Sequence, residues 1–438
     1  MSVHQHWDPL ETCLVGKSYP PEFYDYIKNP KVRNVFERIA IETEEDYQKL
    51  ISKLEEFNVE VVRMHIGDLD EYVSTNQNDL CRITPPMQPR DFTAMVGDRL
   101  YMPGEDFCKL DSLESLYNGM FGDWTTDKNE KYDQKVLAKY IMDIMEPGRP
   151  HSKGGAYTQI REKYSDTLGN MPNFVMSMID TKELKDLVQA SVMSTIGKNH
   201  NRQFNRPGYP DVWKDLREWA KNNKVECVHD TYINSASMWR IGKNLRFNLI
   251  NLVSYVNHDH FRKNWENLFP DYNVDILPIP GHCDGGCHPI VPGLIAGAGD
   301  PETYAKYWPG WEFVDVGGTG WDQVQPFLKL KEQNRGRWWI PGEENNQDLI
   351  DFVSTWMDDW VTYVEETVFD VNMLVIDEKN IICNNYNKNL FDALDRWGIT
   401  AHLVNFRHRY FWDGGLHCIT SDLKRRGEQH DYSNTLAT

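Results

Sequence analysis

The residue with the clearest chemical potential is Cys418, in the stretch DGGLHCITSDLKRRG (413–427) near the C-terminus. Two glycines precede a His-Cys pair, and glycine allows a backbone to approach other groups closely. A thiol attacks as the thiolate, which needs a neighbouring cation or base at neutral pH. Free cysteines are also among the most buried residue types, so core filling is the alternative interpretation. The basic run KRR (424–426) is interpreted as solvated or salt-bridged.

Polar residues stand just before four of the hairpins that the sequence predicts, and they are Asp91, Ser237, His282, Asp284 and Glu365. If the hairpins surround one channel, these residues meet there with Cys418. His282 can then act as the base for the thiol. Asp91 and Asp284 can hold a guanidinium group through charge-assisted hydrogen bonds, and that cation makes a thiolate tolerable beside carboxylates. The sequence therefore predicts attack of a thiolate on a guanidinium carbon.

The elements that must position these residues follow a strand–strand–helix–strand pattern. Two short apolar runs, separated by turn residues, are followed by an amphipathic helix and a β-rich strand. The pattern recurs five times without sequence identity. The hairpins are expected at 8–16, 92–102, 237–250, 289–297 and 372–383, and the helix–strand segments at 43–65, 211–229, 260–279, 301–316 and 387–406.

Five such units predict a pseudo-symmetric, five-bladed α/β propeller of ββαβ modules, with each helix on the outside. One unit cannot bury both faces of its sheet, whereas a closed ring of units can. We expect a single domain over residues 1–438, with helical insertions at about 104–208 and 317–370. Two doubly wound domains are the alternative, but parallel crossovers need no hairpin before each helix.

The composition is that of a large folded protein with few possible partners. The chain has 438 residues, 40% of them hydrophobic, and a formal net charge of −19. That charge argues against nucleic acid and anionic membranes. The N-terminus lacks the features of a signal peptide, and no apolar run is long enough to span a bilayer. The eight cysteines are scattered, which favours free thiols and a cytoplasmic location.

The stretch HCDGGCH (282–288) also suggests a metal site, because two cysteines and two histidines fall within it. Structural zinc sites usually pair two such clusters, and the chain has no comparable second cluster. We therefore expect no metal and no cofactor.

These residues resemble the glycine amidinotransferases and their inosamine-phosphate relatives in the guanidino-modifying pentein superfamily. The resemblance runs from HWDPLE (6–11) to the C-terminal HCITSDLKRRG, and it is strong at PRD (89–91), HCDGG (282–286) and NMLVIDEK (372–379). It is weak in the two insertions. It implies the fivefold pentein propeller and transfer of an amidino group from arginine or an analogue to an acceptor amine through an amidino-cysteine.

The resemblance also assigns roles to residues. It implies Cys418 as the nucleophile, His282 as the general acid and base, and Asp91 with Asp284 as guanidinium ligands. The partners would be a small guanidino donor and an amine acceptor. The oligomeric state stays open, with a homodimer as one alternative.

The chain departs from the family pattern around the donor pocket. Ser237 stands where the family has an Asp that holds the catalytic histidine, and Glu365 replaces one of two serines that contact the donor. Pro301 stands near the position of the arginine that binds the donor carboxylate. We therefore predict that Ser237 and Glu365 line a rebuilt pocket. A guanidine hydrolase of the deiminase type, and a non-catalytic guanidino-binding protein, remain alternatives.

Overall fold

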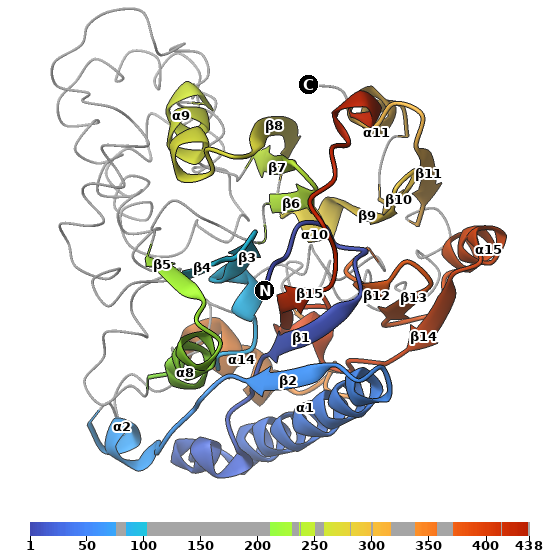
Figure 1. Ribbon diagram of the computed structural model, residues 1–438. Helices are drawn as coiled ribbons and strands as arrows, with labels where there is room; N and C mark the ends of the chain where they lie inside the picture. The colour runs from blue at the N-terminus through green and yellow to red at the C-terminus, as the bar shows by residue number, and fades with distance from the viewer. Residues whose placement is uncertain are drawn as a thin grey trace, which may run out of the picture.

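The computed structural model describes most of the residues that form the predicted repeat (Figure 1). The described ranges are 1–75, 85–102, 211–229, 236, 238–249, 258–280, 282–298, 301–316, 338–356, 371–412 and 414–436. Ser237, Glu365 and the first predicted insertion lie outside these ranges, as does most of the second insertion.

The described strands form five three-stranded sheets, as the repeat predicts. In four of them, two antiparallel strands form a hairpin, and a third strand pairs in parallel with the second strand after a helix. The first of these units contains β3 (Ala94–Val96), β4 (Arg99–Met102), α8 (Lys214–Asn222) and β5 (Glu226–His229). The second contains β6 (Met238–Ile241), β7 (Asn244–Leu249), α9 (His258–Leu268) and β8 (Asn273–Pro280). The third contains β9 (Cys287–Val291), β10 (Leu294–Gly297), α11 (Pro301–Tyr307) and β11 (Glu312–Asp315), and the fourth contains β12 (Leu374–Asp377), β13 (Asn380–Cys383), α15 (Lys388–Trp397) and β14 (Thr400–Leu403).

The first sheet shows that the hairpin predicted over 8–16 is wrong. This segment contains one strand, β1 (Leu10–Val15), since its apolar run is not interrupted by turn residues. The antiparallel partner of β1 is β15 (Thr420–Arg425), and β2 (Glu60–Arg63) pairs with β1 in parallel. The chain ends therefore share a sheet, which places the Cys418 turn, directly before β15, among the other sheets.

The helix α1 (Pro30–Glu56) begins well before the segment predicted at 43–65. Asn29 caps it by accepting a hydrogen bond from the Lys31 N–H at 3.0 Å, and Pro30 fits the first helical turn. The buried face of α1 packs with α14 (Gln347–Trp356), which lies in the second predicted insertion. Helix α1 also lies beside β2, on the outer side of the first sheet (Figure 1).

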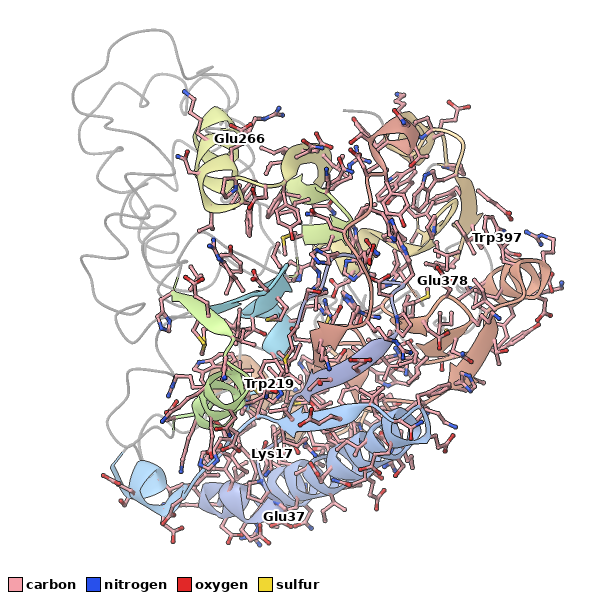
Figure 2. The ribbon with its side chains drawn as sticks, in the orientation of Figure 1. Lys17, Glu37, Trp219, Glu266, Glu378 and Trp397 are labelled. Atoms are coloured by element: carbon pink, nitrogen blue, oxygen red, sulfur yellow. The ribbon has the colours of Figure 1, made fainter. Side chains whose placement is uncertain are left out.

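The five sheets lie around a common centre, and helices α1, α8, α9, α11 and α15 lie outside it (Figure 1). Isolated β-bridges tie the N-terminal segment to the hairpins, with Val3 opposite Gly97 and Gln5 opposite Ile241. Side chains fill the space between the sheets (Figure 2). Among the described helices, none has both the length and the apolar character that crossing a membrane would require.

Candidate active site between the sheets

Cys418 lies in a tight turn directly before β15, with 1% of its surface exposed. The turn is closed by hydrogen bonds from the Ile419 N–H to the Gly415 carbonyl and from the Thr420 N–H to the His417 carbonyl, at 3.1 and 3.2 Å. A Cβ on Gly415 would lie 2.5 Å from Asn372 Oδ1. The glycine therefore allows the turn to pass close to Asn372, as the sequence predicts for a crowded centre.

Two buried side chains contact the thiol of Cys418. Asn372, just before β12, donates from Nδ2 to Cys418 Sγ at 2.8 Å. Its Oδ1 accepts the backbone N–H groups of His417 and Cys418 at 2.8 and 3.1 Å. Asp284, in the single-turn helix α10 (Cys283–Gly286), accepts from Cys418 Sγ at 3.4 Å. The thiol therefore lies between an amide donor and a carboxylate acceptor.

Asp284 is also paired with His417, the residue before the cysteine. The Asp284 Oδ2 to His417 Nδ1 distance is 2.7 Å, and both side chains are buried. A carboxylate accepts only, so Nδ1 carries the proton of this hydrogen bond. Burial, together with the nearby Arg90, lowers the pKa of His417 well below its ordinary value. The His417 ring therefore holds Asp284 Oδ2 beside the sulfur.

The other predicted site residues that the structure describes lie on segments next to this turn. Asp91 is half-buried in the 3-10 turn η3 (Pro89–Asp91), and its neighbour Arg90 donates from Nε to the His417 carbonyl at 2.8 Å. His282 is the half-buried N-cap residue of α10, two residues before Asp284. The described structure thus brings Asp284 into contact with Cys418 and places Asp91 and His282 on adjacent segments.

A buried cationic cluster, which the sequence patterns did not predict, lies next to the turn. Asp422, on β15, accepts hydrogen bonds from Arg90 at 2.6 Å, Arg240 at 2.7 Å and Arg425 at 2.8 Å. Burial alone raises the pKa of Asp422, but the three guanidinium groups hold it well below its ordinary value. Arg425 belongs to the KRR run, so this run is only partly a surface feature, with Lys424 paired to Glu11 at 2.7 Å.

Three buried histidines surround Trp239 beside this cluster. The rings of His6, His288 and His417 have centroids 4.8, 4.8 and 5.5 Å from that of Trp239. His6 Nε2 accepts the Arg240 backbone N–H at 3.1 Å. Burial, followed by the nearby arginines, lowers the pKa of His288 to about 3 and that of His6 well below its ordinary value. His6 and His288 are therefore neutral at physiological pH.

These neutral histidines predict sensitivity to acid. An unfolded histidine binds a proton below about pH 6.5, whereas His6 and His288 do not bind one until the pH is much lower. The free energy of unfolding is therefore unaffected by these histidines above about pH 6.5. Below that pH it falls by up to about 1.4 kcal/mol per pH unit for each of them. The free energy of unfolding, measured with denaturant at a series of pH values, should fall less steeply with decreasing pH for His288→Leu than for the native protein. An equal slope would contradict the prediction, and the exposed His229→Gln is the matched control.

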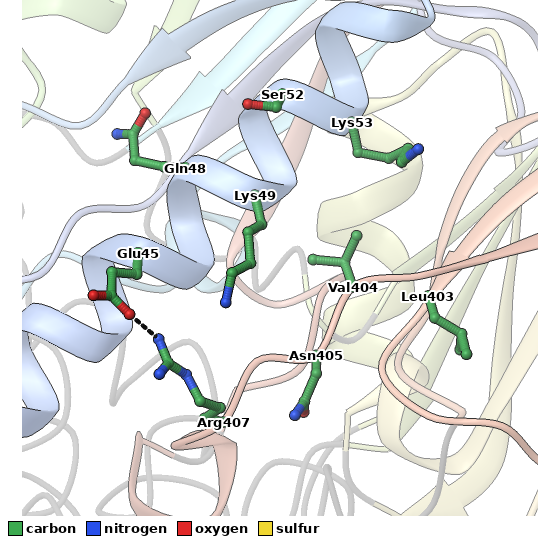
Figure 3. A pocket seen from close by; sticks show the side chains of 9 residues that line it. All are labelled: Glu45, Gln48, Lys49, Ser52, Lys53, Leu403, Val404, Asn405 and Arg407. Carbon is green, nitrogen blue, oxygen red and sulfur yellow. Dashed lines mark hydrogen bonds and ion pairs between the residues drawn. The ribbon is translucent and has the colours of Figure 1, made fainter.

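A surface pocket lies apart from these residues, between α1 and the segment after β14 (Figure 3). Its basic side chains already have acidic partners, with Arg407 2.7 Å from Glu45 and Lys49 3.1 Å from Asp46. None of the residues that contact Cys418 lines it. Among the described residues, no group of His, Cys, Asp and Glu side chains is arranged to hold a metal ion.

The chain is similar to known proteins in sequence and in fold. No protein-family profile matches the chain. The mitochondrial glycine amidinotransferase of Xenopus tropicalis is 25% identical over 217 residues, which are 49% of this chain and 43% of that protein. The L-arginine:L-lysine amidinotransferase of Pseudomonas savastanoi pv. phaseolicola is 22% identical over 230 residues, 51% of this chain and 53% of that protein. The chain therefore spans about half the length of the curated relatives that it matches.

Solved structures match over nearly the whole chain, and one example is an amidinotransferase. SxtG, an amidinotransferase of the saxitoxin biosynthetic pathway from Microseira wollei, superposes with a TM-score of 0.50 and 14% identity. The match covers 98% of this chain and 99% of that one. At this identity the match reports the fold.

Proposed function

We propose that this chain, a pentein-fold member of the amidinotransferase family, transfers an amidino group from a guanidino donor to an acceptor amine. The relatives confirm the resemblance predicted from the sequence, and the SxtG match confirms the predicted α/β fold class apart from closure of the propeller. The observation that carries the proposal is the contact between the buried Cys418 thiol and the buried Asp284 carboxylate, 3.4 Å apart among the sheets. A thiol beside a carboxylate suits a substrate that is a cation and an electrophile at once.

The guanidinium group of the donor supplies the charge that activates the thiol. A carboxylate alone disfavours a thiolate beside it, because like charges repel. A donor held by Asp284 and Asp91 through charge-assisted hydrogen bonds reverses that effect. Bound donor therefore promotes the nucleophile that attacks it, and an empty site keeps the thiol protonated.

The reaction then proceeds in two displacements. His282 takes the proton of the Cys418 thiol, and Sγ forms a bond to the guanidinium carbon. The bond from this carbon to the donor amine breaks as His282 gives the same proton to that nitrogen. The acceptor amine next attacks the amidino-cysteine and loses a proton to His282. The carbon–sulfur bond breaks, its electron pair returns to Cys418, and His282 returns the proton to the thiolate. His417 acts by holding Asp284, which its 2.7 Å contact supports.

Further features of the chain are inferred together with this activity. We infer a closed five-unit propeller, which the arrangement of the sheets in Figure 1 supports. A cytoplasmic location fits the six described cysteines, none of which forms a disulfide. Ser237 and Glu365 remain predicted residues of the donor pocket. The donor is arginine or an analogue, and a homodimer remains one alternative for the assembly.

One experiment separates this function from its alternatives. The protein is incubated with arginine and a panel of amines, and the products are identified by mass. Ornithine with an amidinated amine indicates transfer, whereas citrulline indicates that water intercepts the intermediate. Absence of both products, with every amine and with a panel of arginine analogues, would leave a guanidino-binding protein without turnover.

Removing the charge of either guanidinium ligand should weaken donor binding. Asp91→Asn and Asp284→Asn each leave a guanidinium edge facing a neutral acceptor, a loss of about 1.5–3 kcal/mol. Calorimetry of arginine or its analogue, on a Cys418→Ser background that prevents turnover, measures this loss. Asp392→Asn, on the exposed face of α15, is the control. If both ligand variants bind the donor as tightly as the protein that keeps Asp91 and Asp284, the guanidinium group is held elsewhere.

A further inference from the structure

Asn372 contacts the Cys418 turn at three points, although the sequence analysis gave it no role. Its side chain is 1% exposed and lies directly before β12. Its Oδ1 accepts two backbone N–H groups, those of His417 and Cys418. These two N–H groups fix the orientation of the amide, so Nδ2 faces the sulfur, 2.8 Å away, and the Asp284 backbone carbonyl, 3.4 Å away.

We propose that Asn372 is a further catalytic residue of the amidino transfer proposed above, because its Nδ2–H group donates a hydrogen bond that stabilises the Cys418 thiolate. A hydrogen bond to the charged form of a group favours that form. The described acidic neighbour of the sulfur, Asp284, acts in the opposite direction. The amide donor therefore offsets part of the repulsion that the carboxylate imposes on the thiolate.

The same hydrogen bond serves both displacements. In the first, Sγ must carry negative charge before it attacks the guanidinium carbon. In the second, Sγ leaves the amidino group and takes back an electron pair. The backbone of the Cys418 turn fixes the Asn372 Nδ2–H group, so this group does not have to move between the two steps. A fixed hydrogen-bond donor of this kind stabilises developing charge without a cost of reorganisation.

The second glycine of the GG pair is part of this arrangement. A Cβ on Gly415 would lie 2.5 Å from Asn372 Oδ1 and 2.7 Å from its Cγ. Asn372 is tied to buried groups on both sides, so it cannot move away at low cost. Gly415 thus provides the space in which the amide reaches both the backbone and the sulfur.

The test compares two replacements of Asn372. Asn372→Asp retains the acceptor for the two N–H groups but places an oxygen against the sulfur. Asn372→Leu has a similar shape, adds no charge and removes the donor. Asn372→Leu also removes the Oδ1 acceptor of the two N–H groups, which Asn372→Asp keeps. The Asp variant therefore controls for the lost acceptor and the Leu variant controls for the added charge, so a rise in both variants assigns the effect to the Nδ2 donor. Asn387→Asp is the control, since Asn387 is also buried and bonded but caps α15.

The readout is the pH midpoint of Cys418 thiolate formation, from ultraviolet thiolate absorbance after subtraction of the matching Cys418→Ser protein. We expect the midpoint to rise by ~1 pH unit or more in both Asn372 variants and to stay unchanged in Asn387→Asp. A native midpoint in Asn372→Leu overturns the inference. If that variant does not fold, a native midpoint in Asn372→Asp overturns it equally.

This readout needs no substrate, so the two proposals can fail separately. A raised midpoint without product from any donor would leave the role of Asn372 intact and refute amidino transfer. Normal transfer by Asn372→Leu with a native midpoint would refute only the role of Asn372. In active enzyme, we expect kcat/KM near neutral pH to fall at least ~10-fold and to recover as the pH rises.

Discussion

Replacing Cys418 with alanine should lower the rate of amidino transfer by at least about three orders of magnitude. In the proposed reaction the covalent intermediate is carried by the Cys418 sulfur, which the described neighbours of this residue cannot replace. The side chain is buried, and its removal takes away only one atom, so the fold should persist. Product formation at saturating donor measures the effect, and intact mass measures the amidino adduct in the native protein.

Cys383→Ala is the matched control for this change. Cys383 is also a fully buried cysteine, but it lies on β13 within an apolar cluster. Its replacement should cost some stability and leave the adduct and the rate per folded molecule unchanged. Activity of Cys418→Ala above a few per cent of native would show that the nucleophile has been assigned wrongly.

Local sequence patterns predicted four of the five sheets, because each hairpin, helix and return strand carries its own periodicity and turn residues. The first sheet could not be predicted in this way. The partner of β1 is β15, from the opposite end of the chain, and pairing between distant segments leaves no local signature. The apolar pattern of 10–15 shows a strand but does not show which strand lies beside it.

The site was predictable only where chemistry is concentrated in short motifs. Cys418 and Asp284 stand in motifs of that kind, and the structure brings them into contact. Asn372 adjoins an apolar strand. A single amide at such a position does not indicate that it will bind the backbone of a distant turn. The histidine of the His-Cys pair was visible, but its pairing with Asp284 depends on how β15 and α10 meet.

The cationic cluster could not be predicted from the sequence, because its members come from separate parts of the chain and the KRR run that holds Arg425 does not show its partners. Arg90 precedes β3, Arg240 lies on β6, and Arg425 and Asp422 lie on β15. Arg240 also donates to the Met95 carbonyl at 2.7 Å, and Arg425 to the Val375 carbonyl at 2.8 Å. The cluster therefore links the sheets of β15, β3, β6 and β12, and only the assembled fold reveals it.

Asp422→Asn should therefore lower the free energy of unfolding by about 3–5 kcal/mol. Asp422 is the carboxylate that all three buried guanidinium groups share. Burial lowers the pKa of Arg240 to about 10, so this residue is still charged at neutral pH. The neutral amide leaves three buried cations without a compensating charge. Denaturant unfolding at neutral pH measures the loss, and Asp392→Asn, which breaks an exposed pair with Lys388, should change it by no more than about 0.5 kcal/mol.

A second change identifies uncompensated charge as the cause. Adding Arg240→Met to Asp422→Asn removes one of the three uncompensated cations. The free energy of unfolding should therefore fall by less in the double variant than the sum of the two single decreases. Simple additivity would show that Asp422 acts through packing alone. Because Arg90 also binds the His417 carbonyl, any shift of Arg90 in Asp422→Asn reaches the turn that carries Cys418. Reduced transfer by the folded fraction of this variant, restored in part by Arg240→Met, would mean that the cluster supports the catalytic turn as well as the fold.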